Sequence, residues 1–182
     1  KENKNRWLDV GCWENFEKDF YYLDIRPKKL IPLEHRKKYF KIDILNATNK
    51  GLRAIGKFDL IRMQHLLEHF PYEEGKIVIK KIARLLKKGG HVLITVPDLK
   101  IHMDKYIKKK YKRWKYFKKW ATKRVPRDAP ESFYFSVFAH FLLIMPHKWC
   151  YDAAGLKYLL KSSGFFKNIR ELKLNDSLSS FP

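Results

Sequence analysis

The chain has 182 residues, of which 45% are hydrophobic and 15% aromatic. This length and composition exclude wholesale disorder and predict one domain, residues 1–182, with a buried core. Forty Lys and Arg residues against nineteen acidic ones give a formal net charge of +21, which fits either a lysine-biased composition or a functional basic surface. Cys12 and Cys150 form neither a metal-binding pattern nor a disulfide framework, and Lys1 to Arg6 shows no secretory signal, so a cytoplasmic location is expected.

The first part of the chain predicts two strands joined by a glycine turn. Residues 6–10 form the first expected strand, Gly11 follows it, and residues 20–24 form a second strand that ends in Asp24. In a doubly wound sheet this arrangement binds a nucleoside. The glycine lets the backbone approach the ligand, and the acid can accept hydrogen bonds from ribose hydroxyls. Only nine residues separate the strands, so we expect a turn in place of the usual helix.

Strands and helices alternate through the following residues. We expect strands at 39–43, 58–63 and 91–96, and helices at 48–55, at 73–87 before Gly89 and Gly90, and at 152–163 with Asp152 as its cap. A last strand is expected at 165–174, followed by a tail. This order predicts an α/β three-layer sandwich with a mostly parallel sheet.

Residues 99–146 are expected to form a helical insertion after the fifth strand. Thirteen Lys or Arg residues and one acid, Asp104, occupy residues 100–127. A long basic helix is predicted there, with an apolar stripe at Met103, Ile107, Trp114, Phe117 and Ala121. The apolar run at 133–145 is shorter than the roughly 20 residues that span a bilayer. The segment fits a lid, a contact with an anionic membrane surface, or a nucleic-acid-binding face; the predominance of Lys over Arg disfavours nucleic acid.

Several motifs occur in one characteristic order, and this order resembles the class I S-adenosylmethionine-dependent methyltransferases, including a compact bacterial branch often linked to polysaccharide genes. Trp13 stands where that family usually has a second glycine. The resemblance implies a Rossmann-like fold, S-adenosylmethionine as cofactor, and methyl transfer to a small-molecule or saccharide-type acceptor. The motifs are Leu8-Asp9-Val10-Gly11-Cys12, Tyr22-Leu23-Asp24, Phe58-Asp59-Leu60-Ile61, His65-Leu66-Leu67-Glu68-His69, Leu85 to Gly90, Val96-Pro97-Asp98-Leu99 and His147 to Asp152.

By this resemblance, five residues are expected to bind the cofactor. Asp9 and Gly11 would face its methionine part, Asp24 its ribose and Asp43 its adenine, while Gln64 would line the pocket after the fourth strand. Asp9 could instead cap a turn, and Asp43 could be an ordinary loop residue.

His65 and His147 are the expected catalytic bases, because the resemblance places both near the methyl-transfer pocket; His69 and His140 are weaker candidates. Glu68 and His69 are adjacent and have no third ligand at matching spacing, so no metal is expected. Two alternatives remain open. One is a non-catalytic binding module in which Trp13 closes the pocket, and the other is a nucleic-acid methyltransferase.

Overall fold

The computed structural model describes residues 5–110, 129–130, 132–133, 136, 139 and 147–172. The elements are β1 (Trp7–Val10), β2 (Phe20–Asp24), η1 (Lys28–Leu30), η2 (Leu33–Lys38), β3 (Tyr39–Lys41), α1 (Asn49–Ile55), β4 (Phe58–Gln64), η3 (Leu67–His69), α2 (Tyr72–Leu85), β5 (Leu86–Thr95), α3 (Leu99–Ile107) and α6 (Ala153–Ser162), where η denotes a 3₁₀ helix. From β3 to α3, strands and helices alternate along the chain, as the sequence predicts.

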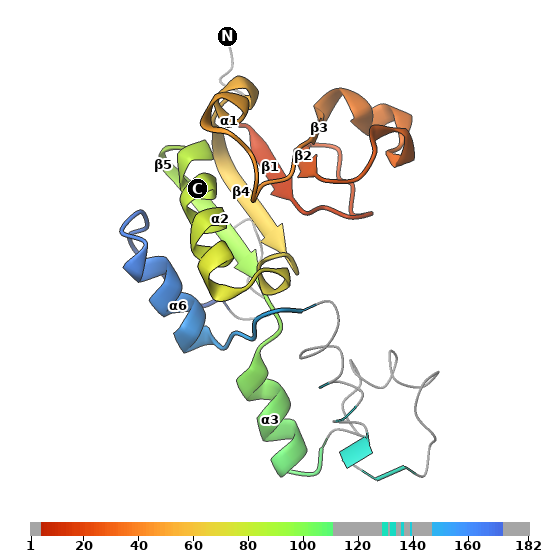
Figure 1. Cartoon of the computed structure of the whole chain (residues 1–182), viewed down its shortest axis with the longest axis vertical. Coiled ribbons are helices and arrows are strands. Elements are labelled where there is room, and N and C mark those ends of the chain that lie inside the picture. Colours follow the sequence, from red (N-terminus) through yellow and green to blue (C-terminus); the bar gives the residue numbers. More distant parts are fainter. Residues whose placement is uncertain are drawn as a thin grey trace.

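The five strands form one parallel sheet in the order β3-β2-β1-β4-β5. The direction of winding reverses between β1 and β4, and in open sheets of this kind ligands bind outside the carboxyl ends of the strands at such a point. The arrows of β4 and β5 point toward the end of the sheet from which α3 leaves (Figure 1). The fold class predicted from the sequence, a Rossmann-like α/β domain, is confirmed.

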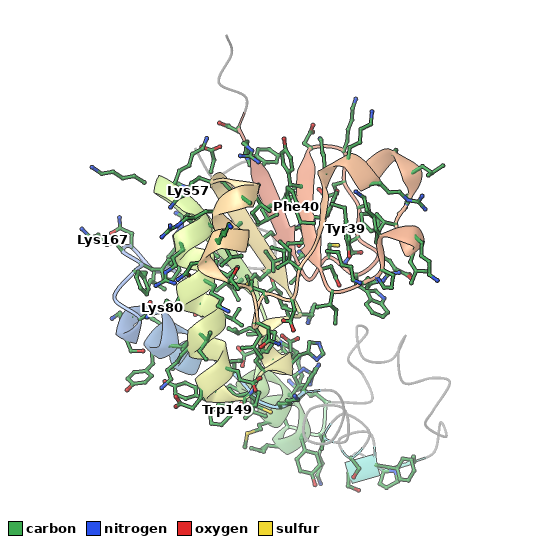
Figure 2. The ribbon with its side chains drawn as sticks, turned by 45° about the horizontal axis from the view of Figure 1, so that its top comes forward. Tyr39, Phe40, Lys57, Lys80, Trp149 and Lys167 are labelled. Atoms are coloured by element: carbon green, nitrogen blue, oxygen red, sulfur yellow. The ribbon has the colours of Figure 1, made fainter. Side chains whose placement is uncertain are left out.

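Alternate side chains along the strands supply two separate cores. Tyr39 and Phe40 are neighbours on β3 (Figure 2), yet Tyr39 belongs to the smaller cluster and Phe40 packs against the larger one. The larger cluster joins the sheet to α1, α2 and α6, while the smaller one lies against the loop before η2. Fully buried members of the larger cluster are Leu8, Val10, Phe58, Ile61, Met63, Leu67, Val78, Ile79, Ile82 and Leu159.

Helices α1 and α6 begin at side-chain caps, and the cap predicted at Asp152 is confirmed. The Thr48 hydroxyl accepts a hydrogen bond from the Gly51 amide at 3.1 Å, and the Asp152 carboxylate accepts one from the Gly155 amide at 2.7 Å. Each bond satisfies a backbone donor that has no partner inside the helix. The nine residues between β1 and β2 contain no helix, as expected.

Several predicted boundaries are wrong. The helix predicted at 73–87 ends at Leu85, and β5 begins at Leu86. The pairing of β5 with β4 moves from Phe58–Leu86 to Leu60–His91, so Gly89, at φ +80°, lies in an irregular part of the strand and does not cap the helix. β3 ends at Lys41, two residues before Asp43.

The prediction of a long basic helix is also wrong, because α3 ends at Ile107. Lys109 has φ +50°, and the Lys110 amide donates to the Lys105 carbonyl at 2.9 Å, which turns the chain out of the helix. No strand forms in residues 165–172. Trp114, Phe117, Ala121, His140 and most of the apolar run lie outside the described residues, so those predictions stay predictions. None of the described helices is both long and apolar enough to span a membrane.

Candidate functional site

In the turn after β1, Gly11 and Trp13 both adopt a positive φ at the edge of the sheet. Gly11 has φ +74°, and its amide donates to the Leu23 carbonyl of β2 at 2.8 Å. A Cβ atom on Gly11 would lie 2.8 Å from a methyl group of Leu66, the second residue after β4. Trp13 also has a positive φ, +48°, which non-glycine residues rarely adopt. The turn therefore keeps a glycine-like backbone even though its second glycine is missing.

Asp24, at the end of β2, holds this turn in place. Its carboxylate accepts hydrogen bonds from the Trp13 amide at 3.0 Å and from the Arg26 amide at 3.1 Å, and its side chain is buried. Oδ2 of Asp24 also accepts a hydrogen bond from the Cys12 thiol at 3.8 Å, so, with two lone pairs on each oxygen, Oδ1 can accept one further hydrogen bond. The predicted ribose ligand thus lies at the predicted edge of the sheet and also organises the glycine turn.

Trp13 is largely exposed to solvent. Its side chain is 65% exposed, and the Arg26 guanidinium lies 4.8 Å from the ring centroid. Arg26 also donates to the Trp13 carbonyl. In this conformation Trp13 is exposed and not buried in the turn, which disfavours the closed-pocket alternative.

Asp9 is buried in an ion pair that the sequence analysis missed. Arg62, its neighbour in register on β4, donates to one Asp9 carboxylate oxygen from Nη2 at 2.6 Å and from Nε at 3.1 Å. The same guanidinium binds Glu17 at 2.5 Å and lies over the Phe20 ring. Burial raises the pKa of Asp9 to about 6, although Arg62 opposes the shift. An arginine inside the otherwise apolar run Phe58 to Met63 is the signal that could have revealed this pair.

The other predicted cofactor residues differ in how far they are engaged. Asp43 is exposed and accepts hydrogen bonds from the Leu45 amide at 2.9 Å and the Asn46 side chain at 2.7 Å, which is the geometry of an Asx turn. Gln64 is half-buried at the last position of β4. Asp98, at the end of the motif Val96-Pro97-Asp98-Leu99, caps α3 by accepting a hydrogen bond from the Lys100 amide at 2.8 Å.

The two predicted catalytic histidines converge on Glu68, which the sequence analysis did not select. Nδ1 of His65 lies 3.3 Å from Glu68 Oε1, and Nε2 of His147 lies 4.0 Å from the same oxygen. Glu68 is only 1% exposed. Hydrogen bonding to Glu68 raises the pKa of His65, whereas burial lowers the pKa of His147.

Backbone contacts hold the distant segment at 147–151 in this position. The Lys148 and Trp149 amides donate to the Glu68 carbonyl at 2.8 and 3.2 Å, and the Leu99 amide donates to the Tyr151 carbonyl at 2.8 Å. Trp149 lies at the same end of the molecule as α3 (Figure 2). One end of the sheet therefore carries a turn suited to a nucleoside and, after β4, a carboxylate–histidine cluster suited to binding or deprotonating a second molecule.

A family model described as "Methyltransferase domain" matches residues 1–167. No curated protein matches the sequence.

Three solved structures share the fold at low sequence identity. An O-methyltransferase family protein from Burkholderia thailandensis is 12% identical to this chain, with a TM-score of 0.53. The match covers 93% of this chain and 48% of that protein. The S-adenosylmethionine-dependent methyltransferase SibL in its apo form is 17% identical with a TM-score of 0.52, and the shares covered are 89% and 44%. PKMT2 from Rickettsia typhi is 12% identical with a TM-score of 0.51, and the shares are 88% and 38%. The chain thus spans less than half the length of each.

Proposed function

The chain belongs to the methyltransferase domain family, and from this premise we propose that it transfers a methyl group from S-adenosylmethionine to a small-molecule acceptor of saccharide type. The observation that carries the proposal is the turn at Gly11 and Trp13, held by Asp24 at the point where the sheet reverses its winding. The remaining lone pair on Oδ1 of Asp24 suits a ribose hydroxyl.

The reaction is an in-line displacement. Bound in the Asp24 turn, S-adenosylmethionine would supply a methyl group on a positively charged sulfur, and a base near Glu68 would take the proton of the acceptor hydroxyl. The sulfonium is already activated, so the protein mainly has to hold donor and acceptor in line. The Asp24 turn would hold the donor, and the cluster around Glu68 would face the acceptor.

We assign the base to His65 or His147, which both lie near Glu68 after β4. His65 is the more accessible, with a side chain 55% exposed against 17% for His147. Replacing a general base lowers the rate on the order of 10²–10⁴-fold. We therefore expect the methyl-transfer rate of His65→Ala to fall on the order of 10²–10⁴-fold while its affinity for S-adenosylmethionine stays unchanged. Full activity in both His65→Ala and His147→Ala would contradict the assignment.

The acceptor class is supported by an aromatic pair beside this cluster. Trp149 is 43% exposed, and its ring centroid lies 5.3 Å from that of Tyr72 at the start of α2. Exposed aromatic faces suit ring-shaped ligands that combine apolar faces with hydroxyl groups. Trp149→Ala should raise KM for the acceptor and leave cofactor binding unchanged.

A further part of the proposal concerns where the protein acts. We propose a cytoplasmic protein in which the basic residues at 100–127 contact an anionic membrane surface, where each Lys or Arg contributes about 1 kcal/mol. Co-sedimentation with vesicles containing phosphatidylglycerol, but not with pure phosphatidylcholine, is the expected result. Binding to polynucleotides that weakens steeply with salt would favour nucleic acid as the partner.

The experiment that tests the function measures cofactor binding first and methyl transfer to an acceptor second. S-adenosylmethionine and S-adenosylhomocysteine should each raise the melting temperature in a concentration-dependent way, because a ligand that binds only the folded state stabilises it. S-adenosylhomocysteine should then accumulate when hydroxyl-bearing sugars are added. Cofactor binding without turnover on any sugar, amine or polynucleotide would make the chain a binding module.

A further inference from the structure

A second group of side chains, distinct from the cofactor turn, converges after β4. Glu68 and His69 belong to η3, and His147 comes from the segment that returns beside them. One ligand atom from each of the three lies within 4.8 Å of the other two. The rings of His69 and His147 meet edge to face, with centroids 4.9 Å apart.

Two polar atoms in this group are buried without a hydrogen-bond partner in the described part of the chain. They are Oε2 of Glu68 and Nδ1 of His147. Glu68 is a carboxylate with 1% exposure, and leaving such an acceptor unpaired is costly, about 1–3 kcal/mol or more for a charged group. Glu68 therefore presents one unpaired carboxylate oxygen close to imidazole nitrogens, and such atoms are electron-pair donors that a metal ion can accept.

We infer that Glu68, His69 and His147 form a binding site for a divalent transition-metal ion of the zinc class. Two imidazoles and one carboxylate are a ligand set of zinc sites that keep a fourth position open. Zinc lies about 2.0–2.2 Å from such ligands, so ligand atoms around one tetrahedral ion are roughly 3.4 Å apart. The observed spacing of 4.8 Å or less therefore requires side-chain movements of about an ångström.

The backbone already holds the distant ligand near its final place. The Glu68 carbonyl accepts from both the Lys148 and Trp149 amides, directly after His147. The sequence spacing shows no such site, because the third ligand comes from a remote segment and reaches η3 only in the folded chain. The expectation of no metal, drawn from the spacing of Glu68 and His69, considered only ligands close in sequence.

The site bears on the acceptor side of the proposed function but does not depend on it. An imidazole nitrogen that binds a metal holds no proton, so His147 would position the ion and His65 would remain as the base. The open position could hold an acceptor hydroxyl and make it more acidic. Metal binding and methyl transfer are measured separately, so one can fail while the other stands.

The test is a titration of tag-free, EDTA-treated protein with Zn²⁺ by calorimetry and with Co²⁺ by visible absorption. Wild-type protein should bind one ion per chain, and Co²⁺ should show the strong bands of four- or five-coordinate geometry. His147→Gln and His69→Gln should each weaken binding at least tenfold, since even second-shell changes cost about 10–100-fold. Glu68→Gln, which keeps the side-chain shape, should do the same.

His35→Gln is the matched control, because His35 lies on η2 and stacks on Phe16, outside the group. It should bind as wild type does. The inference is overturned if wild-type protein binds neither ion at one per chain, or if His35→Gln weakens binding as much as a folded His147→Gln or His69→Gln variant. Circular dichroism establishes that each variant is folded before its titration.

Discussion

At the scale of single residues, Trp13 holds a backbone conformation that suits glycine. A left-handed conformation costs an L-residue about 1–2 kcal/mol, and the contact of the indole with Arg26 offsets part of it. Trp13→Gly should therefore unfold at higher urea concentration than Trp13→Ala, by about 1 kcal/mol in free energy of unfolding. Equal stability, or a more stable alanine variant, would show that the turn does not require the positive φ.

His102 makes a second residue-scale prediction, about pH. Burial lowers its pKa from the ordinary 6.5 to about 3, so the folded state holds it neutral while the unfolded state takes up a proton below 6.5. Stability should thus fall as the pH drops from 6.5 toward 3. At 1.36 kcal/mol per pH unit, the loss at pH 5 is about 2 kcal/mol.

The measurement compares urea unfolding of wild type and His102→Gln at pH 7 and pH 5. Asp9 acts in the opposite direction, because its raised pKa favours the folded state at acid pH, but it is common to both proteins and cancels in the difference. We expect His102→Gln to lose less stability than wild type on acidification, and His35→Gln to lose as much as wild type. Parallel losses in all three would refute the burial effect.

The residues that sequence reasoning found and missed differ in how their partners are placed. Gly11 and Asp24 were predictable, because the strand–turn–strand pattern is local. The pairing of Arg62 with Asp9 and the approach of His147 to Glu68 depend on contacts between segments far apart in the chain. A linear pattern carries no distance between such segments, so Glu68 was weighed only as a metal ligand beside His69 and not as a partner of the histidines.

At the scale of elements, the turn after β1 fits against the residues after β4. A Cβ on Gly11 would lie 2.8 Å from Leu66, whereas a Cβ on Gly89, which also has positive φ, would meet nothing within 4 Å. Gly11→Ala should therefore cost about 1–3 kcal/mol more than Gly89→Ala, because both strain the backbone and only one overpacks. Equal losses in denaturant unfolding would show that Leu66 moves aside freely.

Elements with strong periodicity or buried apolar runs were predicted well, and those defined by pairing were not. The first two strands and the fourth, and the last helix after Asp152, lie within a residue or so of their expected positions. β5 began earlier than expected, because the extended residues before Gly89 pair with β4. The basic helix was predicted too long, because apolar residues keep helical spacing in the sequence beyond Lys109, where the chain turns.

At the scale of the whole molecule, the strand order brings the proposed donor and acceptor sides together. β1 and β4 are adjacent in the sheet although distant in the chain, so the turn after one lies beside the cluster after the other. The α/β class was predictable from the alternation of elements. The resemblance to methyltransferases suggested which edge of the sheet carries the site. The parallel pairing of the strands places their carboxyl ends together at that edge.

The central claim is that the turn held by Asp24 binds S-adenosylmethionine, and calorimetry of wild type, Asp24→Asn and Asp19→Asn tests it most directly. Exposed Asp19, just before β2, lies at the opposite end of that strand and serves as the control. Wild type and Asp19→Asn should bind S-adenosylmethionine and S-adenosylhomocysteine equally well. Asp24→Asn should bind roughly ten- to hundredfold more weakly, from losing hydrogen bonds to a charged acceptor. Absence of binding in folded wild-type protein, or unchanged affinity in Asp24→Asn, would contradict the account.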